Sequence, residues 1–447
     1  MTQDCAVGSA LEPKPTVCVA SNGGARAGVL TAVAALALAA ALAACRGGPT
    51  PAATHTPAPG PAPTAPMVPT PPASQASATP AQSQMALYIW VSPEFASAAQ
   101  PDNAALLQGF TEAYPGIRVH VSVKETYGKG GMVDLLAGAS RVAPAYLPDL
   151  ILLDEDSLGQ VAALGLVQPV DVLAPSVREA LFANVQAAGD GVPFAMDFPL
   201  LAYRAPMTLP LTLGAIAESG GRYAFAAGDE DAATRSLLAQ YMGLGGALVD
   251  AEGKAALDSR LLTRVLETYR GLADQGVLAP QVLSLDRDEV WDLYRAGGAN
   301  FAEVWASQVR SRPSALADAG LAALPTADGR PIALARVWSW AIVSPTPERQ
   351  QAAARFLEWV LQVGPQSAWC EAAHRVPTQA GAWPLAGLSA AHSEFLLGMA
   401  QVATPCPPAL RTPAVTSALH TALSQVLKGQ LAPRQAAEQA LNKIRQQ

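Results

Sequence analysis

The feature that most constrains the fold is an alternation of strand-like and helix-like segments that begins near residue 86. The segment IRVHVSV at 117–123 alternates apolar and polar residues, as a strand with one solvated face does. The segment PDLILLD at 148–154 is a continuous apolar run, which is typical of a strand buried on both faces. The helix-like segment SLGQVAALG follows at 157–165. Strands that alternate with helices predict an α/β fold with a mostly parallel sheet.

The N-terminal segment carries an export signal. An apolar stretch at 27–44 follows Arg26 and ends in Leu42-Ala43-Ala44-Cys45, which matches the bacterial lipobox. We therefore expect residues 1–44 to be a lipoprotein signal peptide and Cys45 to be the lipidated N-terminus of the mature chain. The alternative is an ordinary membrane anchor with an incidental cysteine, because about 18 apolar residues is the lower limit for a bilayer span. Two or more acyl chains anchor a protein stably, whereas one holds weakly.

The next segment, 45–85, has the composition of a tether. It is rich in Pro, Ala, Thr and Ser, and Arg46 is its only charged residue. Such a segment cannot bury enough apolar surface to fold. Proline-rich chains favour extended polyproline II, so this segment is predicted to be disordered and to reach on the order of 100 Å. It would hold the globular part away from the membrane.

Charge and cysteine usage narrow the class of protein further. The net charge is −7 and arises after residue 85, where no basic stripe appears, so we expect no nucleic-acid partner. Cys5 and Cys18 belong to the expected leader, which leaves Cys370 and Cys406. In an oxidising compartment two such cysteines most simply form one disulfide, worth roughly 3–4 kcal/mol in the chain-entropy model. No CxxC or HxxxH spacing predicts a metal site.

The order of the segments resembles the extracellular solute-binding proteins of bacterial ABC importers, in the sugar-binding group that includes maltose-binding protein. The resemblance covers 86–447 and rests on several stretches together, namely YIW, LLQGFTEAYPGIRVHV, PDLILLDEDSLGQVAALGLVQPV, GVPFAMDFPLLAYR, LLAQYMGLGGALVDAEGKAALDS and LKGQLAPRQAAEQALNKI. It implies a two-lobed, type II periplasmic-binding-protein-like α/β fold. The ligand cleft would lie between lobes that are joined by hinge strands. The expected segments are 86–195 and 303–364 for lobe 1, and 196–302 and 365–447 for lobe 2.

The resemblance also implies a function. The chain would be an extracytoplasmic receptor, anchored to the cell membrane as a lipoprotein, that captures a small solute and delivers it to an ABC permease without chemistry or cofactors of its own. Tryptophans and acids favour a carbohydrate as the solute. One alternative is a surface glycosidase, since paired carboxylates hydrolyse glycosides; its acids would come from Asp154, Asp156, Asp197 and Glu303. The other is a binding protein that signals to a membrane kinase.

Candidate ligand residues come from topology and from the resemblance. Ligands of open α/β sheets bind at the carboxyl ends of strands, which places Trp90-Val91-Ser92 and Asp154-Glu155-Asp156 near the cleft. The resemblance adds residues at the lobe crossings and in the loops. Sugar recognition uses aromatic faces for the ring and carboxylates for the hydroxyls. The candidate ligand residues are Trp90, Ser92, Glu94, Asp154, Asp156, Asp197, Tyr203, Glu303, Trp305 and Trp338.

Each candidate also has a structural alternative. The aromatic candidates can be core residues, and Asp154 and Asp156 can form a turn and a helix N-cap. In RVWSWAIVS at 336–344, Trp338 is predicted to lie in a loop as a ligand platform, and Trp340 to begin a buried strand. If both lie on one face of the same strand, they share one role.

Overall fold

The computed structural model describes residues 84–446, except 101–104, 171–172, 187–190, 205–206, 208, 317–318, 328 and 384. The expected signal peptide, the lipidated Cys45 and nearly all of the expected tether lie outside the described residues. In the part that is described, no helix is long and apolar enough to cross a membrane.

The larger of two sheets has seven strands in the order β10-β4-β9-β3-β1-β2, and β11 pairs with β9. Strand β1 runs parallel to β2 and β3, whereas β9 runs antiparallel to β3 and β4. All five residues of β3 are buried, as the apolar run predicts, while β2 at the sheet edge buries only Ile117. The strands are β1 (Met85–Val91), β2 (Ile117–Val123), β3 (Leu150–Asp154), β4 (Val192–Asp197), β9 (Leu334–Ile342), β10 (Val376–Pro377) and β11 (Thr404–Pro405).

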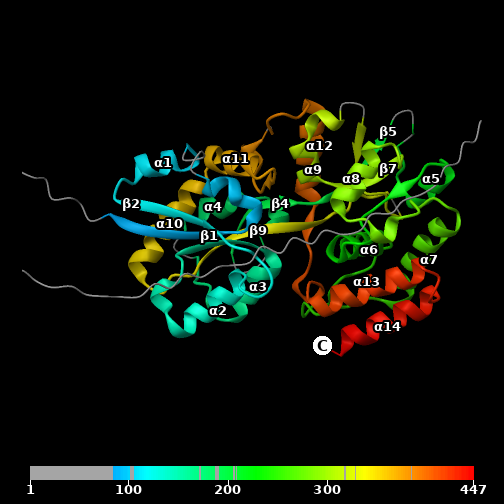
Figure 1. Cartoon of the computed structure of the whole chain (residues 1–447), viewed down its shortest axis with the longest axis horizontal. Helices are drawn as coiled ribbons and strands as arrows, with labels where there is room; N and C mark the ends of the chain where they lie inside the picture. Colours follow the sequence, from blue (N-terminus) through cyan, green and yellow to red (C-terminus); the bar gives the residue numbers. More distant parts are fainter. Residues whose placement is uncertain are drawn as a thin grey trace, which may run out of the picture. The chain divides into compact units, whose positions relative to one another are not determined.

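Successive side chains of β3 point to opposite faces of the sheet, and all five are buried. Both faces are therefore apolar, and helices cover both. Leu150 and Leu152 pack in one hydrophobic cluster, and Ile151 and Leu153 pack in another. The second of these clusters also holds residues of α2 and α3, which lie on one side of the sheet, whereas α1 and α11 lie on the other (Figure 1). The helices of this lobe are α1 (Ala105–Ala113), α2 (Met132–Val142), α3 (Glu155–Ala163), α4 (Pro175–Glu179), α10 (Pro347–Val360) and α11 (Val363–Ala372).

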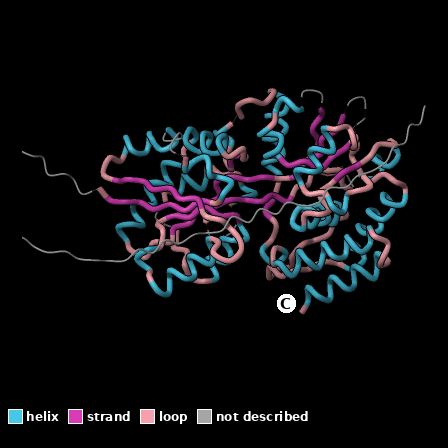
Figure 2. The backbone as a smooth tube through the Cα atoms, in the orientation of Figure 1, coloured by secondary structure: helices cyan, strands magenta, loops and turns pink. Residues whose placement is uncertain are grey.

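The smaller sheet has four strands in the order β6-β7-β5-β8. Leu201 and Phe301 on one face pack in a cluster with helices α6, α7, α13 and α14. Figure 2 shows the two groups of strands with helices around them. The elements here are β5 (Pro199–Arg204), β6 (Tyr223–Ala224), β7 (Phe301–Trp305), β8 (Ala319–Ala322), α5 (Leu213–Glu218), α6 (Glu230–Gly243), α7 (Ser259–Asp274), α8 (Arg287–Arg295), α9 (Ala306–Ser311), α12 (Ala390–Val402), α13 (Pro413–Leu427) and α14 (Pro433–Arg445).

The two sheets confirm the predicted α/β fold with two lobes, but the prediction of a mostly parallel sheet is wrong, because β9 runs antiparallel to both β3 and β4, and β5 to both β7 and β8. Strand β4 belongs to the larger sheet and β5 to the smaller, so the chain crosses between them at Phe198. Sheet pairing divides the chain at other places than the expected segments. Strands β7 and β8 pair with β5 in the smaller sheet, whereas β10 pairs with β4 and α11 packs against the larger sheet.

The expected disulfide is wrong, because Cys370 and Cys406 are both free and buried. Cys370, in α11, packs in the cluster of the larger sheet, and Cys406, just after β11, packs in the cluster of α13 and α14. Each thiol therefore fills its own core as a small apolar side chain does. Burial raises the pKa of both thiols to about 12, so both stay protonated at neutral pH.

Candidate ligand-binding site

Asp154 ends β3 and is the N-cap of α3, as the structural alternative predicts. Its Oδ1 accepts hydrogen bonds from the amides of Asp156 and Ser157, each at 3.0 Å. The Tyr127 hydroxyl donates to Oδ2 at 2.6 Å. The side chain is buried, and its contacts satisfy the first amides of the helix. Asp154 therefore holds the turn from β3 into α3.

Asp197 ends β4 at the crossing between the two sheets. Its Oδ1 accepts from the amide of Ser307 at 2.9 Å, and its Oδ2 accepts from the Ser307 hydroxyl at 2.7 Å. Asp197 is 2% exposed. The carboxylate thus joins the first turn of α9 to the crossing strand. This contact accounts for a charged residue within an apolar run.

Glu303 lies on β7 and is buried against α6. It accepts hydrogen bonds from the hydroxyls of Ser236 and Tyr223, the latter at 3.2 Å. Burial raises the pKa of Glu303 to about 7, which the two hydroxyl donors only partly oppose. Removal from water disfavours the charged form of a carboxyl when its neighbours are neutral.

Arginine side chains lie over the faces of two candidate tryptophans, Trp305 and Trp338. The Arg287 guanidinium lies 4.8 Å from the ring centroid of Trp305, and that of Arg375 lies 4.8 Å from the ring centroid of Trp338. The two indoles are 1% and 2% exposed. Each therefore has a cation–π contact within the protein.

The predicted loop position of Trp338 is wrong, because β9 includes both Trp338 and Trp340. The two residues are separated by one position, and both pack in the same hydrophobic cluster. Trp340 contacts Phe194 and Trp369 edge to face at centroid distances of 5.6 and 5.7 Å. The two tryptophans therefore share a buried face of one strand.

Three candidates at this end of the larger sheet carry buried polar atoms that have no hydrogen-bond partner among the described residues. They are Ser92 Oγ, Glu94 Oε2 and Trp338 Nε1. Ser92 directly follows β1, and its amide donates to the Leu152 carbonyl at 3.3 Å. Trp338 pairs in register with Asp154 at the end of β3. Atoms of this kind also occur elsewhere among the described residues, for example Trp291 Nε1 and Trp383 Nε1, so it is their position at the strand ends that makes these three candidates for contact with a ligand.

The remaining candidates, Trp90 and Tyr203, are half-buried. Trp90 lies on β1, and the Lys124 ammonium lies 5.3 Å from its ring centroid. Tyr203 lies on β5, opposite Phe301 of β7, on the smaller sheet. The structure thus groups Ser92, Asp154 and Trp338 at one end of the larger sheet and places Tyr203 on the other sheet.

The sequence reasoning missed a cluster of ion pairs beside Asp154 and Asp156. Arg235 on α6 is 2% exposed. It donates to Glu155 Oε1 on α3 at 3.1 Å and to Asp231 Oδ1 at 2.9 Å. Arg336 on β9 donates to the other oxygen of Asp231 at 2.8 Å. The spacing of Asp231 and Arg235, four residues apart on one helix, is the sequence signal that could have indicated this cluster.

A further pair links the same helix α3 to the start of α13. Arg411 donates to Asp156 Oδ1 at 3.0 Å. We name the residues of these contacts the interlobe ion-pair cluster; its members are Glu155, Asp156, Asp231, Arg235, Arg336 and Arg411.

The carboxyl groups of the interlobe ion-pair cluster differ in their pKa values. Burial favours a raised pKa for Asp231, but Arg235, Arg336 and Arg287 outweigh it and lower the pKa to about 2. Burial raises the pKa of Glu155 to about 7, although Arg235 opposes this shift. Asp231 therefore stays charged near neutral pH, whereas burial raises the pKa of both Glu155 and Asp156.

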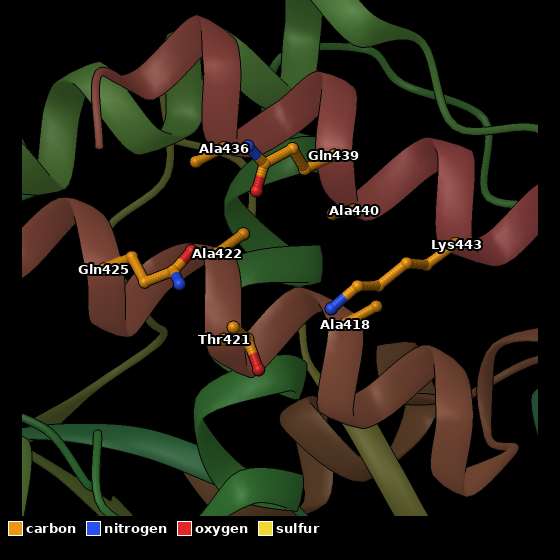
Figure 3. A pocket seen from close by; sticks show the side chains of 8 residues that line it. All are labelled: Ala418, Thr421, Ala422, Gln425, Ala436, Gln439, Ala440 and Lys443. Atoms are coloured by element: carbon orange, nitrogen blue, oxygen red, sulfur yellow. The ribbon is translucent and has the colours of Figure 1, made fainter. Parts of the chain in front are cut away.

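Two hollows of the described surface lie away from these residues. The one between α13 and α14, beside Gln425, Gln439 and Lys443, holds about 30 Å³ (Figure 3). That volume admits a water molecule and no sugar-sized solute. A shallow hollow of about 500 Å³ lies at the start of β1, near Met85 and Tyr114, and so at the opposite end of that strand from Ser92. Among the described residues, no group of His, Cys, Asp and Glu could hold a metal ion.

Two lobes with polar side chains at the strand ends between them define the class of two-lobed binding proteins, and solved structures agree. The cyclic alpha-maltosyl-1,6-maltose binding protein from Arthrobacter globiformis is 16% identical, with a TM-score of 0.67 over 81% of this chain and 98% of its own. The sugar-binding protein MalE from Xanthomonas citri is 19% identical, with a TM-score of 0.67 over 81% and 97%. A ribitol-bound solute-binding protein from Agrobacterium radiobacter is 18% identical, with a TM-score of 0.62 over 82% and 99%.

Residues 105–391 match the family of bacterial extracellular solute-binding proteins, and the chain belongs to that family. Membership implies an extracytoplasmic location. No curated protein sequence matches the chain.

Proposed function

We propose that this chain is a lipid-anchored receptor that binds a carbohydrate or polyol between its lobes and delivers it to an ABC permease. The family supports solute binding outside the cytoplasm. The similar structures bind maltosyl sugars and ribitol, which supports a polyhydroxyl solute. The lipobox at Cys45 supports the anchor, and the proline-rich segment after it supports a tether to a membrane partner.

The observation that carries the choice of solute is the set of unpartnered polar atoms on Ser92, Glu94 and Trp338. They comprise a hydroxyl, a carboxylate oxygen and an indole N–H. A sugar hydroxyl both donates and accepts, so it can satisfy all three kinds of atom. Burying such atoms without partners is costly, and a bound solute removes that cost.

The matched variants are Ser92→Ala, Glu94→Gln and Trp338→Phe, each of which removes or neutralises one polar group and keeps most of the side-chain volume. Calorimetry of the full chain with a panel of sugars and polyols, guided by mass spectrometry of the co-purified solute, gives the affinity. We expect each variant to bind about 10-fold more weakly, as the loss of a buried hydrogen bond predicts. Arg434→Gln, which breaks a surface pair within α14, is the control and should bind as wild type does.

Wild-type affinity in all three variants would contradict this site. The glycosidase alternative has its own readout, because it requires turnover of aryl glycosides that Asp197→Asn abolishes. We expect no turnover by either protein, since the Asp197 oxygens are engaged by Ser307.

A further inference from the structure

The interlobe ion-pair cluster joins elements of the two lobes to each other. Helix α3, which carries Glu155 and Asp156, packs its apolar side in the cluster of Ile151 and Leu153 under the larger sheet. Helix α6 carries Asp231 and Arg235, and its buried leucines pack with the smaller sheet's helices. The pairs Arg235–Glu155 and Arg411–Asp156 therefore each have one partner on each lobe.

The contacts are buried and well formed, unlike most surface pairs. The side chains of Arg235 and Glu155 are 2% and 1% exposed, and those of Arg411 and Asp156 are 8% and 22% exposed. Arg235 also donates to the carbonyl of Ala335 on β9 at 2.7 Å. One guanidinium thus binds α6, α3 and β9 together. Removing one partner of such a pair leaves a buried charge uncompensated, which is far more disruptive than the loss of an exposed pair.

We propose that the interlobe ion-pair cluster is an internal latch that holds the two lobes closed when no solute is bound. In a hinged binding protein that closes only around its ligand, the ligand supplies the contacts between the lobes. Here the chain supplies them itself, through two guanidinium–carboxylate pairs and the Arg336–Asp231 pair beside them. The open form is then the minor state without solute, and a solute bound between the lobes has less of the closure to stabilise, which raises the apparent affinity.

The test measures the distance between the lobes without any solute, so its result does not depend on the proposed sugar site. Spin labels are attached through encoded ketone amino acids at Val142 on α2 and Glu267 on α7, which are both exposed. Labels of this kind leave the cysteines untouched. Electron–electron double resonance on the solute-free full chain then gives the distribution of distances between the two spin labels.

We expect wild type to show one short distance, and Arg235→Met and Arg411→Glu to shift most of the population to a longer one. The charge-swapped Asp156→Lys/Arg411→Glu protein should regain the short distance. Arg434→Gln, which breaks a pair inside α14, should match wild type. Circular dichroism confirms that each variant is folded, and Arg411, the more exposed of the two arginines, provides the test if Arg235→Met does not fold.

The proposal is overturned if solute-free wild type already shows the longer distance, or if both single variants keep the short one. Solute affinity is a second readout. Because the latch favours the closed form, which is the form that surrounds a solute, Arg411→Glu should bind the co-purified solute several-fold more weakly than wild type. If the single variants shift to the longer distance but the protein binds no sugar, the proposed function is refuted and the latch is not.

Discussion

At the residue scale, the buried acids named from the sequence differ in what donates to them. Asp154 accepts from backbone amides at a helix start, and Asp197 from an amide and a serine hydroxyl. Glu303 accepts only from two hydroxyls. Amides at a helix start carry partial positive charge and stabilise a carboxylate, whereas hydroxyls in an apolar core do so less well. For Glu303 burial has the larger influence, since it raises the pKa and the two hydroxyl donors only partly oppose that rise.

Glu303→Gln should change how stability depends on pH. The pKa of Glu303 is raised from 4.5 to about 7 in the folded protein. Between these values the folded state binds more protons than the unfolded state, so stability falls as pH rises, by on the order of 3 kcal/mol in all. Glutamine stays neutral; its Oε1 accepts from one hydroxyl, and its Nε2 donates to the oxygen of the other. Thermal melts of the full chain from about pH 5 to 8 should therefore be flatter for the variant, which should also be the more stable at the upper end.

The control for Glu303 is Glu438→Gln, which removes an exposed carboxylate on α14. The stability of that variant should depend on pH as the stability of wild type does. If Glu303→Gln also keeps the wild-type dependence on pH, the raised pKa does not contribute to the stability of the protein.

At the scale of elements, the periodicity of apolar residues predicted the helices and strands, which depend on residues close in sequence. The buried strand β3, the helix α3 after it and the strand β2 all lie where the pattern placed them. Periodicity did not predict contacts between segments that are distant in sequence. The disulfide prediction failed because Cys370 and Cys406 pack in different cores, and the ion pairs of Arg235 were missed because Glu155 lies 80 residues away. The strand ends that carry Ser92 and Asp154 could be located from the sequence, whereas the strand position of Trp338 and the partners of the acids could not.

Asp154→Ala tests whether this residue is mainly a helix cap. Asp258, the N-cap of α7, accepts from the amides of Arg260 and Leu261 and is the matched cap in the other lobe. Loss of a capping side chain costs about 1 kcal/mol. We expect Asp258→Ala to lower the melting temperature of the full chain by a small amount, and Asp154→Ala to lower it more, because Asp154 is buried and also accepts from the Tyr127 hydroxyl. An Asp154→Ala protein with wild-type stability and no solute binding would instead make Asp154 a direct ligand.

At the scale of the whole molecule, the residues from β1 onward differ in composition from the proline-rich segment that precedes them. Residues from β1 onward bury two sheets and three hydrophobic clusters. The proline-rich segment before β1 lies almost wholly outside the described residues, and its composition predicts a tether. In the proposed function, this tether provides reach toward a membrane permease, and the two lobes provide closure around the solute.

Cys45→Ser should release the protein from the membrane. In a bacterium that processes lipoproteins, loss of the Cys45 thiol removes the site for the acyl chains, and without them nothing in this proposal holds the receptor at the bilayer. Immunoblots of membrane and soluble fractions should find wild type with the membrane and the variant in the soluble fraction. Cys370→Ser, which changes a thiol in the folded core, should stay with the membrane. A Cys45→Ser protein that remains bound would favour the alternative, an apolar stretch at 27–44 that is retained as an ordinary anchor.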